Sequence, residues 1–414
     1  MSAKTYPTFH PIESHNENRT GVAVLGATGS IGRSTVDLLS QSPNRFRVVA
    51  LTAQKSVPQM LALCQQFHPE VVVMVDPAAA QQLTEQLNAL KLNIVVLSGV
   101  SALERAATWP GVDVVVAGVV GFAGLPAIWA AIVAHKRIVF VNKEPLIAAG
   151  ALLMDHLRQH PSATLLPADS EHNGVFQCMP AGYTVGMRAE SVDHLTITAS
   201  GGPFRTWTRE EMKSVTPAMA VKHPNWSMGA KITVDSATMM NKGLEWIEAY
   251  WLFGLPQEDI RVVVHPQSII HGWVQYKDGS IISHMGAPDM RVPIGYGLAY
   301  PERLAITTGR IDLAKLGHLD FEPMDEQRFP CFQLAKQALR QGPAHTVALN
   351  AANEVAVAAF LAGEIPFLGI AALIESVLAL TPVSSLQSLD DVIHLDAECR
   401  SIAQQQVHTH EHAY

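Results

Sequence analysis

Two acidic residues separated by one position, in the segment LLPADSEHNG (165–174), are the first candidates for chemistry. If the apolar run before Asp169 and Glu171 is a strand, both side chains start on the same face of it. Like charges held together destabilise each other unless a positive group lies between them. We expect oxygen ligands without Cys or His, and therefore a hard divalent cation such as Mg²⁺ or Mn²⁺. A pair of solvated loop acids is the alternative.

A second group of polar residues lies in VDSATMMNKGLEWIEAYWLFG (234–254), which we interpret mainly as a helix. Lys242 and Asn241 precede Glu245 by three and four residues, so all three can share one face. Ser236, Asn241 and Lys242 together favour phosphate binding near a helix start. Glu245, one turn further along, could complete the ligands of the cation. An amphipathic helix with a solvated polar face is the alternative.

Two loops could line the same site. TASGGPF (198–204) ends a predicted strand in Ser200 and two glycines, which expose backbone N–H groups and a hydroxyl to an anion. VKHPNWSMG (221–229) contains His223 and Trp226 and could be a lid that excludes water. A surface histidine and a core tryptophan are the alternatives.

FVNKEPL (140–146) places Asn142, Lys143 and Glu144 at the carboxyl end of another predicted strand. A lysine near a metal-bound carbonyl can orient the substrate and stabilise negative charge. The structural alternative is an ordinary helix start with Pro145 at its first position.

A glycine-rich loop, GATGSIG, follows the first predicted strand and precedes a helix beginning near Ile31. Its three glycines allow backbone N–H groups to approach a pyrophosphate, and they are Gly26, Gly29 and Gly32. The end of the second strand offers no carboxylate for a ribose hydroxyl, only Gln54, Lys55 and Ser56. A lysine and a hydroxyl suit a 2′-phosphate, so NADP is favoured over NAD. A tight turn without a ligand and a solvated Lys55 are the alternatives.

Seven apolar runs recur at intervals of about 20–25 residues, with helix-like stretches between most of them. They are GVAVLG (21–26), FRVVALT (46–52), EVVVMVD (70–76), NIVVLSG (93–99), DVVVAGV (113–119), RIVFVNK (137–143) and ATLLPAD (163–169). This alternation predicts an N-terminal Rossmann-like domain at 21–168, an α/β fold with a doubly wound, mostly parallel sheet. The charge-free run 114–134 is long enough to span a bilayer, but we interpret it as a buried strand, a turn and a helix.

The rest of the chain has a different pattern. Strands are predicted at 194–202, 231–235, 260–265 and 279–285, and a helix at about 238–253, capped near Asp235 or Ser236. We expect a central α+β catalytic domain at 169–300 with a flexible loop at 221–229, a linker at 301–330 and a small C-terminal α-helical domain at 331–414. Residues 1–20 are polar, without an apolar core of signal-peptide length, and we expect a flexible tail.

Composition limits the class of partner. The 414 residues are 48% hydrophobic and 16% charged, which is typical of a folded protein with a substantial core. A formal net charge of −8 argues against nucleic acid or an anionic membrane as the main partner. The four cysteines lack CxxC spacing and indicate reduced thiols in a cytoplasmic protein; they are Cys64, Cys178, Cys331 and Cys399.

Six motifs occur in a fixed order: GATGSIG, VNKE, ADSEHN, SGGPF, HPNWSMG and DSATMMNKGLE. In that order they closely resemble the 1-deoxy-D-xylulose 5-phosphate reductoisomerase family, over about residues 20–400. The resemblance implies a cytoplasmic homodimer that binds NADPH and Mg²⁺, Mn²⁺ or Co²⁺. The implied reaction converts this sugar phosphate to 2-C-methyl-D-erythritol 4-phosphate, for isoprenoid precursors of the non-mevalonate pathway.

The resemblance also implies roles for single residues. The implied catalytic residues are Lys143, Asp169, Glu171 and Glu245, of which Asp169, Glu171 and Glu245 are the implied metal ligands. The implied substrate contacts are Lys143, Ser170, Glu171, Ser200, His223, Trp226, Ser236, Asn241, Lys242 and Glu245. The implied cofactor contacts, besides Gly26, are Thr28, Gly29, Ser30, Ile31, Asn142, Glu144 and Gly229. Where many members read Gly-Lys-Asn, this chain has Gln54, Lys55 and Ser56, so only Lys55 is retained at the adenine end.

The expected chemistry begins with a metal that binds the ketone and a neighbouring hydroxyl oxygen and acidifies the hydroxyl. The carbon skeleton then rearranges, by retro-aldol cleavage and re-aldolisation or by an α-ketol shift, before NADPH reduces the branched aldehyde. Two other classes share some of these features. An aldehyde dehydrogenase would need a cysteine nucleophile, for which Cys178 is the nearest candidate. A non-catalytic nicotinamide-binding sensor would need the glycine loop but not the three acids.

Overall fold

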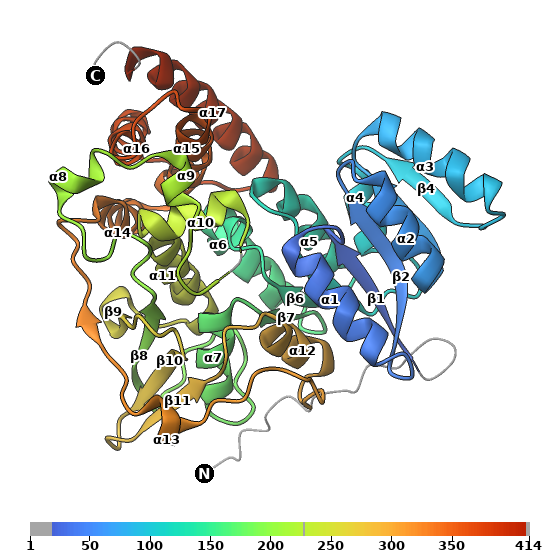
Figure 1. The fold of residues 1–414 in the computed structure, drawn as a ribbon, viewed down its shortest axis with the longest axis horizontal. Helices are drawn as coiled ribbons and strands as arrows, with labels where there is room; N and C mark the ends of the chain where they lie inside the picture. Colours follow the sequence, from blue (N-terminus) through green and yellow to red (C-terminus); the bar gives the residue numbers. More distant parts are fainter. Residues whose placement is uncertain (1–18, 227, 411–414) are drawn as a thin grey trace.

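Seven parallel strands form the first sheet of the computed structural model, which describes residues 19–226 and 228–410. Their order is β4-β3-β2-β1-β5-β6-β7, so the chain starts near the middle and winds outward to both edges (Figure 1). The strands are β1 (Thr20–Leu25), β2 (Phe46–Ala53), β3 (Val71–Met74), β4 (Val95–Ser98), β5 (Val114–Ala117), β6 (Arg137–Phe140) and β7 (Thr164–Pro167). Each predicted apolar run contains one of them, and the doubly wound sheet is confirmed.

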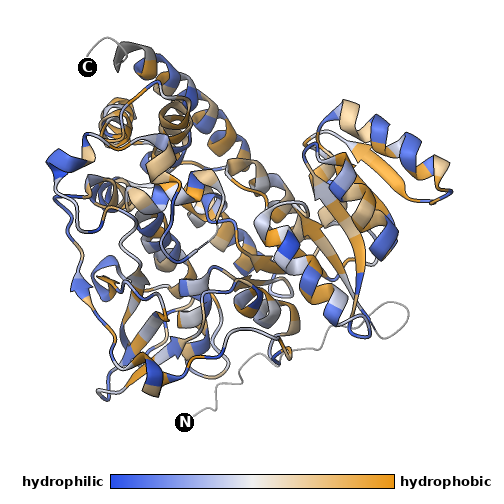
Figure 2. Ribbon diagram, in the orientation of Figure 1, coloured by the Kyte–Doolittle hydropathy of each residue, from blue (hydrophilic) through white to orange (hydrophobic). Residues whose placement is uncertain are grey.

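Helices cover both faces of this sheet. They are α1 (Ser30–Gln41), α2 (Val57–Phe67), α3 (Pro77–Ala89), α4 (Ala102–Ala107), α5 (Leu125–Val133) and α6 (Glu144–Gln159), with a 3₁₀ turn η1 (Phe122–Gly124). Val22 and Val24 of β1 belong to one buried cluster, whereas Ala23 and Leu25 belong to another. A strand between two helical layers requires this alternation, and it explains the strongly hydrophobic colour of β1 and β2 in Figure 2.

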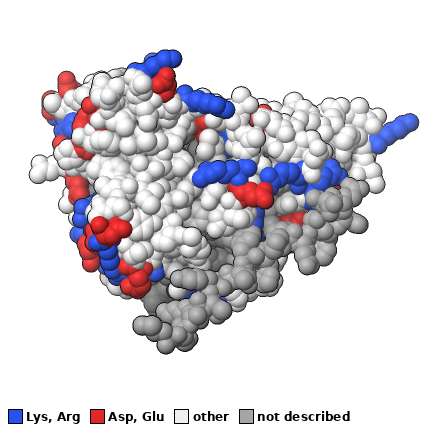
Figure 3. All heavy atoms as spheres, turned by 90° about the horizontal axis from the view of Figure 1, so that it is seen from below, with Lys and Arg blue, Asp and Glu red and all other residues white. Residues whose placement is uncertain are grey.

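The charge-free run 114–134 contains β5, η1 and α5, as predicted. Across the described ranges, we find no helix that combines the length and the hydropathy needed to cross a membrane. Figure 3 shows one face of the molecule, on which uncharged residues dominate and basic and acidic side chains lie in small mixed groups.

Five strands form the second sheet, in the order β11-β10-β8-β9-β12. They are β8 (Val192–Ala199), β9 (Ile260–Val264), β10 (Ile270–Tyr276), β11 (Ile281–Met285) and β12 (Glu322–Pro323). Strands β8 and β9 are parallel, and the other pairs are antiparallel. The sequence analysis missed β10, because Gly272 and two polar residues interrupt its apolar pattern. Strand β12 lies within the segment 301–330 expected to be a linker, and the domain boundaries stay a prediction.

Two predictions for the part of the chain after β7 are wrong. The helices after β7 are α7 (Ser170–Cys178), α8 (Arg209–Met212), α9 (Pro217–Ala220), α10 (Ala230–Ala237), α11 (Met240–Phe253), α12 (Arg291–Ala299) and α13 (Leu313–Leu316), with a 3₁₀ turn η2 (Gln257–Asp259). The segment 231–235 has β-branched residues typical of a strand, but its burial in a helical environment makes it part of α10. The next helix does not begin at Asp235 or Ser236, because Met239 has a left-handed conformation (φ 61°) that separates α10 from α11.

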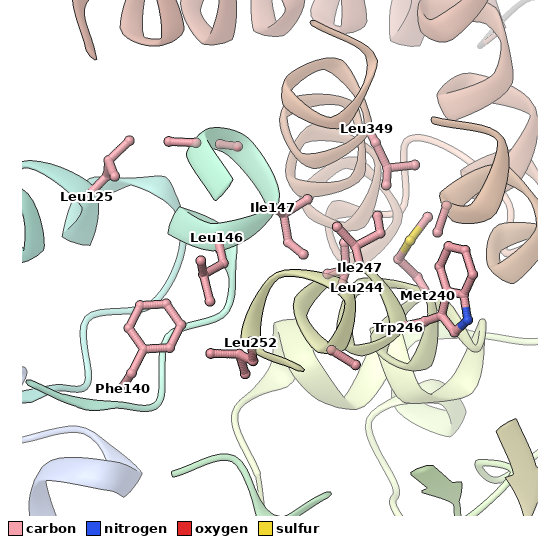
Figure 4. Packing of buried hydrophobic residues seen from close by; sticks show 14 of the residues in the cluster. Leu125, Phe140, Leu146, Ile147, Met240, Leu244, Trp246, Ile247, Leu252 and Leu349 are labelled. Carbon is pink, nitrogen blue, oxygen red and sulfur yellow. The ribbon is translucent and has the colours of Figure 1, made fainter. Parts of the chain in front are cut away.

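Four helices end the described chain: α14 (Pro330–Gln341), α15 (Pro343–Ala362), α16 (Gly369–Leu380) and α17 (Leu389–His410). Helix α15 packs against α16, α17 and α6, and α14 packs against α11. Figure 4 shows Leu349 of α15 close to Ile147 of α6 and Ile247 of α11. The C-terminal helices therefore share a hydrophobic core with the elements that carry the site. Of the predicted tail at 1–20, residues 1–18 lie outside the described residues, and Thr20 already belongs to β1.

Candidate active site

A cavity of about 540 Å³ lies beyond the carboxyl ends of β5, β6, β7 and β8. Ligands of open α/β sheets bind at this position. Its walls contain most of the predicted site residues, namely Ser30, Ile31, Asn142, Lys143, Glu144, Asp169, Ser170, Glu171, Ser200, His223, Trp226, Gly229, Ser236, Asn241, Lys242 and Glu245. The predicted residues outside these walls are Gly26, Thr28 and Gly29, in the loop that leads to Ser30, and Gln54, Lys55 and Ser56, after β2.

Asp169 and Glu171 follow the carboxyl end of β7, as predicted, but they lie at the start of α7, so the expectation that they share one face of a strand is wrong. Asp169 accepts a hydrogen bond from the backbone N–H of Ser170 (2.9 Å) and caps the helix. Two lysines supply the positive charge: Lys143 Nζ lies 2.7 Å from Asp169 Oδ2, and Lys242 Nζ lies 2.8 Å from Glu171 Oε1. Burial favours the neutral acids, but Lys143 lowers the pKa of Asp169 to about 2, and Lys242 lowers that of Glu171.

Glu245 of α11 completes a cluster of three carboxylates. One oxygen of Asp169, Glu171 and Glu245 each lies within 4.8 Å of the others. Lys143 Nζ lies 3.4 Å from Glu245 Oε1, and Lys242 Nζ contacts Glu245 Oε2. Burial and the Glu171 carboxylate nevertheless raise the pKa of Glu245 to about 7. One buried and two partly buried carboxylates thus share two ammonium groups, and this all-oxygen donor set fits a hard divalent cation.

A buried pair behind this cluster was missed by the sequence analysis. His172 Nε2 donates to the backbone oxygen of Glu245 (2.8 Å), and its Nδ1 lies 3.2 Å from Glu248 Oε2. Burial lowers the pKa of His172 to about 4 and raises that of Glu248 well above its ordinary value. With Asp169 these residues form a second possible ligand group, so the expectation of no nearby histidine is wrong. Two features of the sequence could have indicated this pair: His172 directly follows Glu171, and Glu248 lies one helical turn beyond Glu245.

The predicted phosphate-binding groups converge from three elements. Ser236 lies in the last turn of α10 rather than at a helix start, whereas Asn241 and Lys242 lie in the first turn of α11. Ser200 follows β8, and its hydroxyl accepts a hydrogen bond from the N–H of Gly202 (3.2 Å). Hydroxyls, an ammonium group and a helix N-terminus therefore face one part of the cavity, where they can bind an anion.

The described part of the predicted lid (221–226 and 228–229) lies against this anion site. His223 Nε2 and the Ser200 hydroxyl are 3.0 Å apart. His223 Nδ1 accepts the N–H groups of Asn225 (3.1 Å) and Trp226 (2.9 Å), so Nε2 carries the proton of the neutral ring and donates to Ser200. Burial lowers the pKa of His223. Trp226 also lines the cavity.

The glycine-rich loop has the geometry expected of a nucleotide-binding turn. Gly26 has φ 79°, and a Cβ on Gly32 would lie 2.3 Å from the Gly26 oxygen, so neither position accepts a side chain without a shift. The N–H of Gly26 donates to Thr52 Oγ1 of β2 (2.9 Å), which brings segment 54–56 to the same edge of the sheet. Helix α1 begins at Ser30, one residue before the predicted start.

Asn142 and Glu144, which follow β6, are buried and hydrogen-bonded to each other. Lys231 of α10, which the sequence analysis did not single out, lies 2.7 Å from Glu144 Oε1 and 2.8 Å from Asp235 Oδ2. Burial favours the neutral form of Glu144, but the Lys231 ammonium lowers its pKa. A charged carboxylate is therefore held at the wall of the cavity.

All four cysteines are free, as predicted, and all four are buried. Burial raises the pKa of Cys178 to about 11, so its thiol is not ionised near neutral pH. Cys178 is also absent from the residues that line the cavity. A cysteine-dependent aldehyde dehydrogenase site is therefore excluded for this cavity.

Three family models match successive parts of the chain. They are described as 1-deoxy-D-xylulose 5-phosphate reductoisomerase (residues 22–150), its C-terminal domain (165–253) and the DXP reductoisomerase C-terminal domain (285–402). The reductoisomerase of Acidithiobacillus ferrooxidans is 52% identical over 388 residues, which cover 94% of this chain and 97% of the relative. The reductoisomerase of Tolumonas auensis is 48% identical over 391 residues, with 93% and 98% covered.

Solved structures of the same kind superimpose closely. The reductoisomerase of Zymomonas mobilis in complex with NADPH has a TM-score of 0.86 and 44% identity, covering 94% of this chain and 99% of that chain. A DOX-P reductoisomerase in complex with NADPH, fosmidomycin and magnesium has a TM-score of 0.88 and 41% identity, with 94% and 98% covered. The likeness extends over both sheets and the C-terminal helices.

Proposed function

The chain belongs to the 1-deoxy-D-xylulose 5-phosphate reductoisomerase family, and on that premise we propose the reaction and the roles of its residues. The enzyme rearranges 1-deoxy-D-xylulose 5-phosphate and reduces it with NADPH to 2-C-methyl-D-erythritol 4-phosphate, in a reaction that requires a divalent cation. The proposal rests on one observation: three carboxylates, a phosphate-binding group and a glycine-rich nucleotide loop lie around one cavity.

We assign the cation to Asp169, Glu171 and Glu245. When bound there, it polarises the ketone and acidifies the neighbouring hydroxyl of the sugar. Lys143, between Asp169 and Glu245, stabilises negative charge that develops on the substrate oxygens. The Ser170 hydroxyl donates to Glu171 Oε2 (2.5 Å), so its oxygen can accept a hydrogen bond from a substrate hydroxyl. Retro-aldol cleavage with re-aldolisation and an α-ketol shift both require this placement of groups.

We assign the substrate phosphate to Ser200, Ser236, Asn241 and Lys242, with His223 beside them. The phosphate is remote from the reacting carbons, so its binding energy can position the sugar and hold the lid closed. Trp226 then excludes water from the reacting carbons. Truncating the substrate to a sugar without phosphate should therefore lower kcat as well as raise KM.

We assign NADPH to the glycine-rich loop and the wall beside it, with Gly26, Thr28, Gly29, Ser30, Ile31, Asn142, Glu144 and Gly229 as contacts. The cofactor supplies the hydride that reduces the branched aldehyde. Lys55, with Gln54 and Ser56, is the candidate for binding the 2′-phosphate, because the carboxyl end of β2 lies beside the glycine-rich loop.

Loss of NADPH absorbance, measured with the sugar phosphate in metal-stripped protein before and after addition of Mn²⁺, tests this proposal. Turnover that appears only with the metal supports it. Absence of turnover in both conditions, from folded protein that still binds NADPH, would contradict it and favour the nicotinamide-binding sensor.

We propose a homodimer formed through β11, at the edge of the second sheet. Among the described residues this strand pairs only with β10, and Ile281 and Ile282 are 59% and 48% exposed. An apolar edge strand is a template for another strand, and a second copy of the chain can cover it. Sedimentation velocity should show a dimer that Ile282→Lys dissociates; a monomeric wild-type protein would contradict this.

We also propose that the enzyme works in the cytoplasm. Four free, buried cysteines suit a reducing compartment, and NADPH is available there. Fractionation of the source cells with a specific antibody tests this, and recovery with the membrane or secreted fraction would contradict it.

A further inference from the structure

A chain of polar contacts connects helix α15 to the cofactor side of the cavity. Asn353 Nδ2 of α15 donates to Asp235 Oδ1 of α10 at 2.9 Å. The other oxygen of Asp235 lies 2.8 Å from Lys231 Nζ. Lys231 Nζ in turn lies 2.7 Å from Glu144 Oε1, and the second oxygen of Glu144 accepts a hydrogen bond from Asn142. Each of the three charged side chains in this series thus has a partner on both sides.

Burial makes these contacts strong determinants of geometry. The exposed fractions of the side chains are 19% for Lys231, 7% for Glu144 and 1% for Asp235, and Asn353 is fully buried. One ammonium group therefore serves two carboxylates away from water. Removing it would leave both carboxylates uncompensated in a medium of low dielectric constant, where they would repel each other and move.

The residue after Asn353 contacts the segment that follows β5. Glu354 Oε1 accepts the backbone N–H of Phe122 at 3.1 Å, and its Oε2 lies 2.8 Å from Arg400 of α17. Phe122 follows the loop 118–120, which lines the cavity. Two consecutive residues of α15 thus contact α10 on one side and the loop after β5 on the other.

We propose that Lys231 is a positioning residue that fixes the Glu144 carboxylate for NADPH, and that Asn353 of α15 holds Lys231 through Asp235. The inference rests on the proposed function, because that function assigns Glu144 to the cofactor. It gives the C-terminal helices a role in cofactor affinity, in addition to the apolar surface that they cover.

NADPH affinity, measured by fluorescence titration of the metal-loaded full-length protein, tests the role of Lys231. Lys231→Met and Glu144→Gln should each raise the Kd for NADPH by ~10-fold or more, as expected when a buried charge pair loses one partner. The double variant should bind no more weakly than Glu144→Gln alone, because Lys231 acts through that carboxylate. Lys231→Arg should restore the Kd to within ~3-fold of the wild type, since it keeps the charge.

The Asn353→Ala variant tests the contribution of α15. It should raise the Kd and KM for NADPH by ~3-fold or more, about the loss of one buried hydrogen bond, with kcat and the KM for the sugar phosphate almost unchanged. A general loss of structure would change all of these constants together. Lys315→Met, at a lysine whose side chain is 86% exposed, is the matched control and should change none.

Additive effects in the double variant, or an unchanged Kd in folded Lys231→Met protein, would overturn the role of Lys231. An unchanged Kd in folded Asn353→Ala protein would overturn the role of α15. Circular dichroism and thermal unfolding establish folding in each case. Turnover of the sugar phosphate by the wild-type protein tests the proposed function separately, because the positioning role is measured only by differences among variants.

Discussion

A Glu245→Gln variant should lose activity while its metal-free form becomes more stable. The amide keeps the shape of the side chain but removes a charged metal ligand, so turnover should fall by ~10²-fold or more with NADPH binding retained. The stability gain follows from the pKa of Glu245, which rises from its ordinary 4.5 to about 7. The folded protein binds this proton more tightly than the unfolded chain does. The stabilisation is therefore present below pH 4.5 and is lost as the pH rises through 7.

At ~1.4 kcal/mol for each tenfold change in an equilibrium constant, the charged carboxylate destabilises the metal-free fold by roughly 3 kcal/mol above pH 7. The neutral amide removes this cost. Thermal unfolding of metal-stripped protein at pH 6 and pH 8 measures it, and the variant should exceed the wild type by several degrees at pH 8 and by less at pH 6.

Glu375→Gln, at an exposed position of α16, is the matched control for both measurements and should change neither activity nor Tm. Near-normal turnover of Glu245→Gln would remove this residue from the metal ligands. A Tm at pH 8 equal to or below that of the wild type would refute the reasoning that the three carboxylates are incompletely compensated.

Three other outcomes follow. Mn²⁺ affinity, measured by calorimetry, should fall between pH 8 and pH 6 because Glu245 takes up a proton near pH 7, and a flat profile would contradict this. Lys242→Met should raise the KM for the sugar phosphate by ~10-fold or more through loss of a charge-assisted contact; an unchanged KM would remove Lys242 from the phosphate site. Met239→Gly relieves a left-handed conformation that costs about 1–2 kcal/mol, but it deletes a buried side chain that contributes about 2–5 kcal/mol. Urea unfolding should therefore show that the variant is less stable than the wild type. A gain in stability would mean that the backbone effect is the larger one.

Local patterns were sufficient for the first sheet. Strands between two helical layers are apolar on both faces, so runs such as 70–76 and 113–119 identify themselves without tertiary information. The segment 231–235 shows the limit of this approach. Its residues favour a strand, but Thr233 and Val234 are buried in the packing around α10, and packing outweighs a propensity of about 1 kcal/mol.

The site was predicted best where residues lie close together in the sequence. Spacing placed Asn241, Lys242 and Glu245 on one face of α11, and the structure brings them together. Spacing could not show that Lys143 and Lys242 pair with Asp169 and Glu171, because those contacts join residues 26 and 71 positions apart. The contact between Lys231 and Glu144 spans 87 positions, so no local pattern could single out this lysine.

The pairing of three carboxylates with two lysines also sets the order in which ligands can enter. Above pH 7, where Glu245 is ionised, one excess negative charge remains among these five groups, so the metal-free site repels a phosphate dianion. A divalent cation reverses the sign and leaves one excess positive charge, which attracts the same dianion. The cation should therefore precede the sugar phosphate, and capture of the substrate should be slow at any metal concentration that leaves this cluster unfilled.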